Sequence, residues 1–345
     1  MEYRRLGKTD VKVSAICLGT MTWGSQNNEA DAQEQMNYAL TQGVNFFDTA
    51  EMYPIPPNKD SYGSTEAIIG RWLKQNGNRQ NIVLASKVAG PGPKYIRNAS
   101  PLGRQSIEQA VDESLKRLQT DYIDLYQLHW PNRSSYHFQK NWHPLPKTNK
   151  QEQLDNFLEV LETLNQLVKL GKVRHVGLSN ESAWGTMSYL KLAEQHQLPR
   201  MVSIQNEYSL LCRLFEPELR EVALVEQCGL LAWSPLCRGF LSGKYLGGAR
   251  PKGSRLAIDP RPDKRSTPSC EAATAAYIDL AKNFEMDPCQ MALAFVLSRD
   301  FVTSAIIGAT NIEQLTNNIS ATQLTLDDEV LKKIHEIRQQ FPIPF

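Results

Sequence analysis

The chain contains 345 residues, 41% of them hydrophobic, and its 38 basic and 37 acidic residues leave a formal net charge of +1. This balance gives no electrostatic reason to expect a nucleic-acid partner or an anionic membrane surface. No apolar run has the length of a transmembrane helix, and the six cysteines show no CxxC spacing, so neither a disulfide framework nor a zinc site is predicted. We expect a cytoplasmic protein.

The first predicted element is a β-hairpin, in which residues 3–6 and 11–13 flank a turn at Gly7–Asp10. An alternation of short apolar strands and amphipathic helices follows. The predicted strands cover residues 15–18, 44–48, 82–85, 124–128, 173–178, 201–204, 229–233 and 303–307. The predicted helices cover residues 29–42, 64–76, 106–118 (with Ser106 as its N-cap), 154–170, 184–196, 219–227, 271–284, 288–298, a segment from about 312, and 327–339.

Eight strand-then-helix units predict an α/β fold with a parallel sheet covered by helices. Eight is the number of strands that closes a (β/α)8 TIM barrel, here with an N-terminal β-hairpin and an extra C-terminal helix. The alternative, an open doubly wound sheet, is disfavoured because no G-x-G-x-x-G follows the first strand. No long linker interrupts the series, so we expect one domain over residues 1–345.

Four ionisable residues stand at or near the ends of three consecutive predicted strands: Asp48, Tyr53, Lys87 and His129. The active site of a TIM barrel lies at the C-terminal ends of its strands, so these side chains would share one mouth. Each residue alone has a structural explanation, such as a turn cap or a solvated lysine. Their joint occurrence is what indicates a catalytic site.

The chemistry open to these four groups is proton transfer to a carbonyl oxygen. A lysine ammonium favours the phenolate of a neighbouring tyrosine, and an aspartate paired with that lysine keeps it charged. Tyr53 would deliver the proton, and His129 would donate a hydrogen bond to the same oxygen. The set lacks an electron source, so a nicotinamide cofactor is the natural complement.

The remaining strand ends suit such a cofactor. Ser179, Asn180 and Gln205 offer polar groups for a carboxamide, and Trp233 offers a face for ring stacking. The loop from Ser234 to Lys244 contains glycines and two cations that suit a pyrophosphate, and Gly308–Ala309–Thr310 before a helix offers an anion site.

The motifs also carry a family resemblance. In order, they are Phe47–Asp48–Thr49–Ala50 with Tyr53, Ala85–Ser86–Lys87, Leu128–His129, Gly177–Leu178–Ser179–Asn180, Ile204–Gln205–Asn206, Trp233–Ser234–Pro235–Leu236, and Ile307–Gly308–Ala309–Thr310 with Gln314. Over essentially its full length the chain resembles the aldo-keto reductases. Residues 19–24, 50–54 and 114–122 are similar to the bacterial Tas-type NADP(H)-dependent members, a group related to the potassium-channel β-subunits.

The resemblance implies reduction of aldehydes or ketones with NADPH, in preference to NADH, on a small-molecule carbonyl substrate. It implies Tyr53 as the proton donor, with Asp48, Lys87 and His129 completing a catalytic tetrad. The implied cofactor contacts are Thr20, Asp48, Ser179, Asn180, Gln205, Trp233, Ser234, Pro235, Leu236, Cys237, Arg238, Lys244, Arg255, Gly308, Thr310, Gln314, Asn317 and Asn318.

Two departures from the family pattern concern specificity. Many members carry an arginine where Gln314 stands, which weakens the expected grip on a 2′-phosphate. The loop 54–64 and the insertion 131–150 are unusually long and would rim the pocket, so substrate size is not inherited from relatives.

Two other functions stay open at this level. Lys87 beside a tyrosine and an aspartate could form a Schiff base in an aldolase. A cofactor-loaded barrel could instead sense redox state for a partner. A metal centre is disfavoured because His129 alone of the six histidines stands at a strand end. The sequence assigns no oligomeric state.

Overall fold

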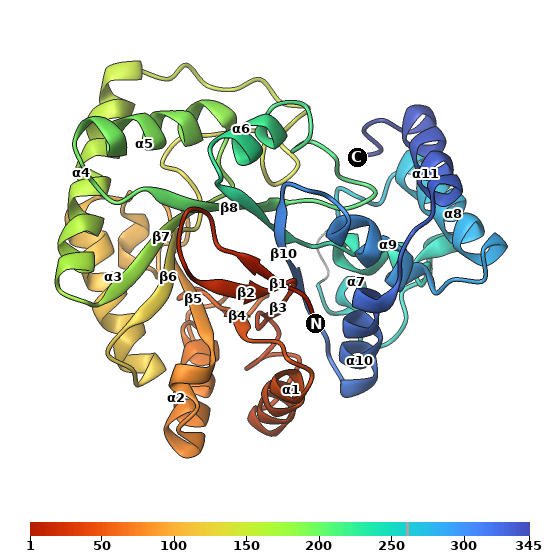
Figure 1. Cartoon of the computed structure of the whole chain (residues 1–345), viewed down its shortest axis with the longest axis horizontal. Helices are drawn as coiled ribbons and strands as arrows, with labels where there is room; N and C mark the ends of the chain where they lie inside the picture. Colours follow the sequence, from red (N-terminus) through yellow and green to blue (C-terminus); the bar gives the residue numbers. More distant parts are fainter. Residues whose placement is uncertain (260–261) are drawn as a thin grey trace.

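The computed structural model describes residues 1–259 and 262–345. Its centre is a closed barrel of eight parallel strands, in the order β10-β3-β4-β5-β6-β7-β8-β9 (Figure 1). The barrel strands are β3 (Ile16–Gly19), β4 (Phe46–Asp48), β5 (Val83–Val88), β6 (Ile123–Leu128), β7 (Val173–Ser179), β8 (Met201–Glu207), β9 (Gly229–Trp233) and β10 (Val302–Ile307). This confirms the predicted (β/α)8 TIM barrel, and the near-continuous burial of the strands is what a sheet covered on both faces requires.

Helices surround the barrel (Figure 1). They are α1 (Glu29–Thr41), α2 (Ser64–Asn76), α3 (Arg104–Leu118), α4 (Lys150–Lys169), α5 (Ala183–Gln195), α6 (Leu219–Val225), α8 (Pro268–Asn283), α9 (Pro288–Leu297), α10 (Ile312–Ser320) and the extra C-terminal α11 (Asp328–Gln340). Their apolar stripes pack on the outer face of the strands to form the main core.

Three predicted helix starts are wrong: α4 begins at Lys150 instead of 154, α8 begins at Pro268 instead of 271, and α3 differs at its N-cap. The helix α3 begins at Arg104 with Gly103 as its N-cap, so Ser106 lies inside the first turn. The Ser106 hydroxyl accepts a hydrogen bond from the Gly103 amide at 3.0 Å and donates one to the Pro101 carbonyl at 2.8 Å. Ser106 therefore acts as the N3 residue of a capping box, whose side chain accepts a hydrogen bond from the backbone amide of the N-cap.

The predicted hairpin closes the N-terminal end of the barrel. The strands β1 (Tyr3–Arg5) and β2 (Lys12–Ser14) pair antiparallel, and Figure 1 shows them lying across that end. Leu6 and Val13 are fully buried there, against an apolar layer of strand side chains. Gly7 has a φ of +58°, and a Cβ at this position would lie 2.5 Å from the Val202 carbonyl oxygen. The opposite end of the barrel is therefore the open one.

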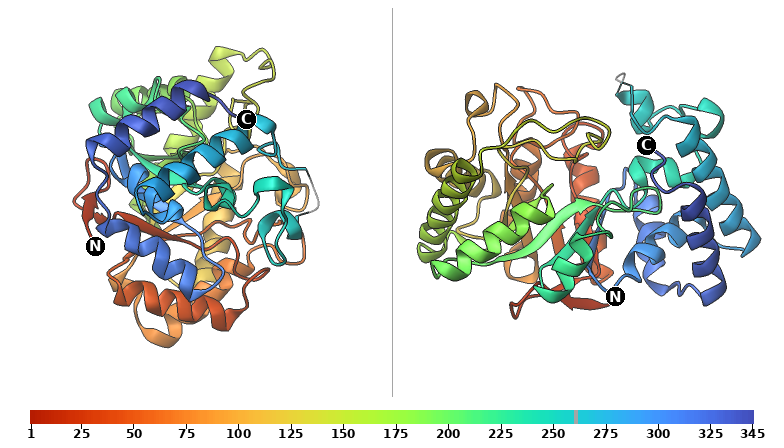
Figure 2. Two further views of the ribbon diagram at one scale, coloured as in Figure 1. Left: turned by 90° about the vertical axis from the view of Figure 1, so that its right-hand side faces the viewer. Right: turned by 90° about the horizontal axis from the view of Figure 1, so that it is seen from above.

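Two long connections gather at that C-terminal end. The insertion 131–150 follows β6. The segment 234–267 follows β9 and contains the short helices η3 (Cys237–Ser242), η4 (Leu246–Gly248) and α7 (Arg255–Ile258). The last residues of the chain touch both, because Asn141 donates to the Phe345 carbonyl at 3.4 Å and Thr267 donates to the Pro344 carbonyl at 2.7 Å. Figure 2 shows the C-terminus following α11, which lies beside α8. Within the described residues, no helix combines the length and apolarity that crossing a membrane requires.

Candidate functional site

The C-terminal end of the barrel holds a fully buried ion pair between Lys87 on β5 and Asp48 at the end of β4. The Lys87 side chain is 0% exposed and that of Asp48 is 3% exposed. The Lys87 ammonium donates to Asp48 Oδ2 at 2.6 Å, to the Thr49 carbonyl at 2.8 Å and to the Tyr53 hydroxyl at 3.4 Å. An ammonium has three protons, so all of its donors are engaged.

Two glutamines hold the second oxygen of Asp48. Gln205 donates to Asp48 Oδ1 at 2.8 Å, and Gln127 donates to the same atom at 3.1 Å. Gln205 also donates to Gln127 Oε1 at 3.0 Å, which links β4, β6 and β8 across the barrel interior. Sequence reasoning missed Gln127. The available signal was an amide side chain two residues before His129, on the same face of the strand as Ile123 and Leu125.

Tyr53 lies in the loop that follows β4, with its hydroxyl facing Lys87 and its ring 4.9 Å from the Lys87 nitrogen. Burial raises the pKa of Tyr53 above its ordinary value, and the opposing charge of Lys87 only partly offsets this. Lys87 favours the phenolate, as expected, but burial favours the neutral phenol more strongly. The phenol keeps its proton at neutral pH.

For the pKa of Lys87, the neighbouring groups outweigh burial. Burial alone would lower the pKa of this lysine, but the Asp48 carboxylate and the Tyr53 phenol together raise it above its usual value. The ammonium consequently stays charged, and it can stabilise negative charge that develops on the neighbouring phenol oxygen.

His129 lies beside Tyr53, with ring centroids 5.8 Å apart in an edge-on arrangement. Burial, together with the charge of Lys87, holds the pKa of His129 well below its usual range, so the imidazole is neutral. Its backbone carbonyl accepts a hydrogen bond from Asn180 at 2.8 Å, and its Nδ1 has no hydrogen-bond partner among the described residues. A neutral imidazole carries one N–H, and such a donor can bond a substrate oxygen.

A second buried ion pair fixes the loop that carries Tyr53. Glu51 accepts two hydrogen bonds from Arg97, at 2.6 and 2.5 Å, and one from the Ala89 amide at 2.6 Å. The Tyr62 hydroxyl donates a fourth hydrogen bond to Glu51 at 3.1 Å. Sequence reasoning missed this pair, because Glu51 and Arg97 belong to loops after different strands and show no motif spacing.

The predicted nicotinamide contacts form one connected group at the ends of β7, β8 and β9. The Ser179 hydroxyl donates to the Gln205 carbonyl at 2.9 Å, Asn180 donates to Ser179 Oγ at 3.1 Å, and Trp233 donates to Asn180 Oδ1 at 3.2 Å. Both amide hydrogens of Gln205 are used by Asp48 and Gln127, so its free group toward a ligand is the carbonyl oxygen. Thr20, another predicted contact, is buried and donates to the Asp48 carbonyl at 2.9 Å.

The predicted phosphate contacts differ in how far their charges are already paired. Arg238 donates to Asp263 at 2.5 Å, whereas the Lys244 side chain is exposed. Arg255 is half-buried, and no carboxylate of the described residues lies within ion-pair distance of it; its polar contact is Met21 Sδ at 3.8 Å. Burial, and then the like charge of Arg238, lowers the pKa of Arg255 to about 10.

Pro235 and Cys237, at the start of η3, are buried. Burial raises the pKa of the Cys237 thiol well above its usual value, so this cysteine acts as a packed apolar residue. Ser234 and Leu236 are half-buried beside them. Ser234 has a φ of +52°, a conformation that turns the chain sharply at the end of β9.

The last predicted contacts surround the start of α10. Gln314 Oε1 accepts from the Thr310 amide at 3.1 Å and from its hydroxyl at 3.2 Å, and Asn318 donates to the Gly308 carbonyl at 3.2 Å. A Cβ on Gly308 would meet nothing within 4 Å, so the space there is open. Asn317 is turned elsewhere, because it bonds Gln290 and Asp287 near α9.

Taken together, the mouth offers a protonated phenol backed by a buried ammonium, a neutral imidazole and an array of amides. This arrangement can protonate a carbonyl oxygen as it gains electrons. The described residues contain no cluster of three His, Cys, Asp or Glu side chains able to hold a metal ion.

Comparison with known proteins adds the family. A family model described as the aldo/keto reductase family matches residues 15–339. Protein tas of Escherichia coli (strain K12) is 46% identical over 347 residues, spanning 100% of this chain and 99% of that protein. The uncharacterized oxidoreductase YrpG of Bacillus subtilis (strain 168) is 36% identical over 351 residues, with 100% and 97% covered.

A more distant relative is a probable voltage-gated potassium channel subunit beta of Arabidopsis thaliana, 30% identical over 352 residues, with 99% of this chain and 98% of that protein covered. Full-length similarity at these levels, together with the matched family model, agrees with the closed barrel. The chain therefore belongs to the aldo/keto reductase family, whose members are oxidoreductases that generally use a nicotinamide cofactor.

Proposed function

We propose that this protein uses NADPH to reduce aldehydes or ketones to alcohols, acting as a single barrel domain over residues 1–345. The observation that carries the proposal is the contact of the Lys87 ammonium with both Asp48 and the Tyr53 hydroxyl. When bound, NADPH supplies the hydride for the carbonyl carbon. The protein supplies the proton and the geometry.

The residues present fit a nicotinamide nucleotide. Arg255 is a half-buried cation with no carboxylate partner among the described residues, and a phosphate group would provide one. Trp233 is held by its bond to Asn180 and offers a ring face, and Gln205 keeps a carbonyl oxygen for a carboxamide. The backbone around Gly308 and Thr310 would receive further phosphate or adenine-side groups.

In this proposal Tyr53 protonates the substrate oxygen from its neutral form. Lys87 stabilises the phenolate that results, and Asp48 together with the two glutamines keeps Lys87 in place. His129 bonds the same substrate oxygen as a neutral imidazole and so orients the carbonyl. Glu51 and Arg97 hold the start of the Tyr53 loop in register with these groups.

The Schiff-base alternative receives little support from the surroundings of Lys87. A nucleophilic lysine needs a free, neutral amine. The Lys87 nitrogen donates to three oxygens, and its pKa is raised above its ordinary value. A redox-sensing role would show itself as tight cofactor binding without measurable turnover.

The proton-donor role predicts a large kinetic effect of Tyr53→Phe. Loss of the hydroxyl should lower kcat for reduction of an aldehyde by about 10²–10⁴-fold, while the affinity for NADPH stays within about threefold. The control is Tyr95→Phe, a partly exposed tyrosine of the neighbouring loop, which should keep full activity. Full aldehyde reduction by Tyr53→Phe would show that another group donates the proton.

The pKa directions predict a flat pH profile for reduction. Tyr53 stays protonated below its raised pKa, above 10, and His129 stays neutral above its lowered pKa, below 6.5. The value of kcat/KM should therefore change less than about twofold between pH 6.5 and 9. An inflection within this range that disappears in His129→Asn would contradict the assignment of a neutral histidine.

Arg255, a half-buried cation without a carboxylate within ion-pair distance among the described residues, predicts a loss of cofactor affinity in Arg255→Gln. Fluorescence titration with NADPH should show a Kd about 10–100-fold higher than in the wild type, because a charge-assisted hydrogen bond is removed. Arg220→Gln, at an exposed arginine of α6, serves as the control and should bind NADPH normally. An unchanged Kd in Arg255→Gln would separate this residue from the cofactor site. A wild-type protein that binds NADH more tightly than NADPH would reverse the proposed cofactor preference.

A further inference from the structure

The insertion 131–150 brings an exposed aromatic ring, Phe138, to the mouth of the barrel. The Phe138 ring lies nearly parallel to that of Trp233, at 27° and 6.3 Å between centroids, and perpendicular to that of Trp130, at 85° and 6.4 Å. Trp130 in turn lies 4.8 Å from the His129 ring, and His129 lies 5.8 Å from Tyr53. A continuous row of ring contacts therefore runs from the proposed proton donor to the proposed cofactor-stacking tryptophan.

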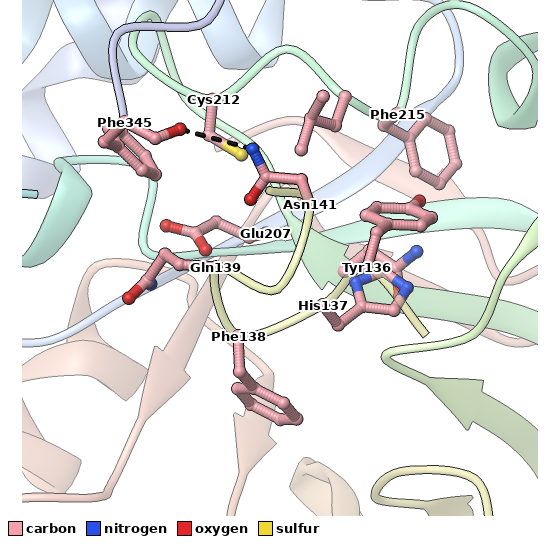
Figure 3. A pocket seen from close by; sticks show the side chains of 11 residues that line it. Tyr136, His137, Phe138, Gln139, Asn141, Glu207, Cys212, Phe215 and Phe345 are labelled. Atoms are coloured by element: carbon pink, nitrogen blue, oxygen red, sulfur yellow. Dashed lines mark hydrogen bonds between the residues drawn. The ribbon is translucent and has the colours of Figure 1, made fainter. Parts of the chain in front are cut away.

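The backbone at this point has an uncommon conformation. Phe138 and Gln139 both have positive φ values, +59° and +56°, a region that residues with side chains rarely adopt unless their surroundings impose it. The ring of Phe138 points away from Asn141, Cys212 and Phe345, which gather on the other side of the segment (Figure 3). The turn at Phe138 and Gln139 thus places the Phe138 ring on one side of the segment and the residues that anchor the segment on the other.

Three contacts anchor that side. His137 Nε2 lies 3.0 Å from the Glu181 carbonyl, and Asn141 donates to the Phe345 carbonyl at 3.4 Å. The Gln139 amide faces the buried Arg265 guanidinium and, with its oxygen turned toward it, accepts two hydrogen bonds at 2.7 Å. These bonds join the insertion to the loop after β7, to the segment after β9 and to the last residues of the chain.

Phe138 is 44% exposed, although His137 and Gln139 on either side of it are anchored. Together with the perpendicular Trp130 ring it forms an apolar corner next to His129. A flat ring entering this corner can meet one aromatic face and one aromatic edge, which are the two favourable arrangements of aromatic pairs. A short aliphatic chain offers no comparable surface.

We propose that Phe138 is a specificity-determining residue that makes the site prefer carbonyl compounds bearing a planar aromatic ring over small aliphatic ones. The inference rests on the proposed reductase function and names its substrate class. Phe138 takes no part in proton or hydride transfer. It acts by burying its exposed ring face against the substrate.

The test compares kcat/KM for 4-nitrobenzaldehyde and for propanal, with NADPH, in the wild type and in Phe138→Ala. The variant should lose about 3–10-fold with 4-nitrobenzaldehyde and stay within about twofold with propanal. Phe138→Tyr keeps a ring and should retain the preference. Trp142→Ala changes a 65% exposed tryptophan of the same insertion and should leave kcat/KM unchanged for both substrates.

Several results would overturn the inference. The role of the ring would be excluded if Phe138→Ala lost activity equally on both aldehydes, if it lost activity on neither, or if Phe138→Tyr lost the preference. In each of these cases, reduction of both aldehydes by the wild type would leave the proposed reductase function intact. If Phe138→Ala fails to fold, Phe138→Leu decides in its place, with the same loss confined to the aromatic aldehyde. A wild-type protein that neither binds NADPH nor reduces either aldehyde would overturn both proposals.

Discussion

The buried ion pair between Lys87 and Asp48 is the constraint on which the site depends. Taking two charges out of water is expensive, and it is tolerated only where the remaining hydrogen-bonding capacity of both groups is met. Here Lys87 uses all three protons and Asp48 uses both oxygens. Loss of one partner alone would leave an uncompensated buried charge, at a cost of about 3–5 kcal/mol. The pair therefore requires polar side chains from several strands at one level of the barrel.

This requirement divides the barrel interior into two halves. Toward the N-terminal end the strand side chains are apolar and the hairpin seals them with Leu6 and Val13. Toward the C-terminal end Gln127 and Gln205 line the same interior and hold the ion pair. The apolar half stabilises the closed barrel, and the polar half fixes the groups that face the mouth. Long loops then enclose those groups and keep Tyr53 and His129 partly shielded from water.

Sequence patterns predicted the barrel because each strand is a short apolar run followed by a helical repeat, and these are local properties. The grouping of Asp48, Tyr53, Lys87 and His129 was predictable because three of them stand at strand ends, whose relative positions the fold determines. Gln127 was missed because a single amide inside a strand is a weak signal, and only the fold shows that it reaches Asp48 on another strand. The Glu51–Arg97 pair escaped because it joins two loops 46 residues apart. The direction of the Tyr53 pKa shift depends on burial, which the order of residues alone does not reveal.

The placement of Phe138 illustrates the same limit of local patterns. Its position depends on the contacts that His137, Gln139 and Asn141 make with distant parts of the chain, namely Glu181, Arg265 and Phe345. The insertion was recognisable from its length, but only the folded arrangement shows which of its side chains reaches the mouth. Loops of this kind adapt one barrel chemistry to different substrates.

In the proposed reaction the barrel transfers hydride from a nicotinamide to a carbonyl carbon, and protein groups supply only the proton. The most direct measurement incubates the protein with 4-nitrobenzaldehyde and NADPH dideuterated at C4 of the nicotinamide, and analyses the alcohol by mass spectrometry. We expect one deuterium on the carbinol carbon of the product. An alcohol without deuterium, or no alcohol at all, would contradict it.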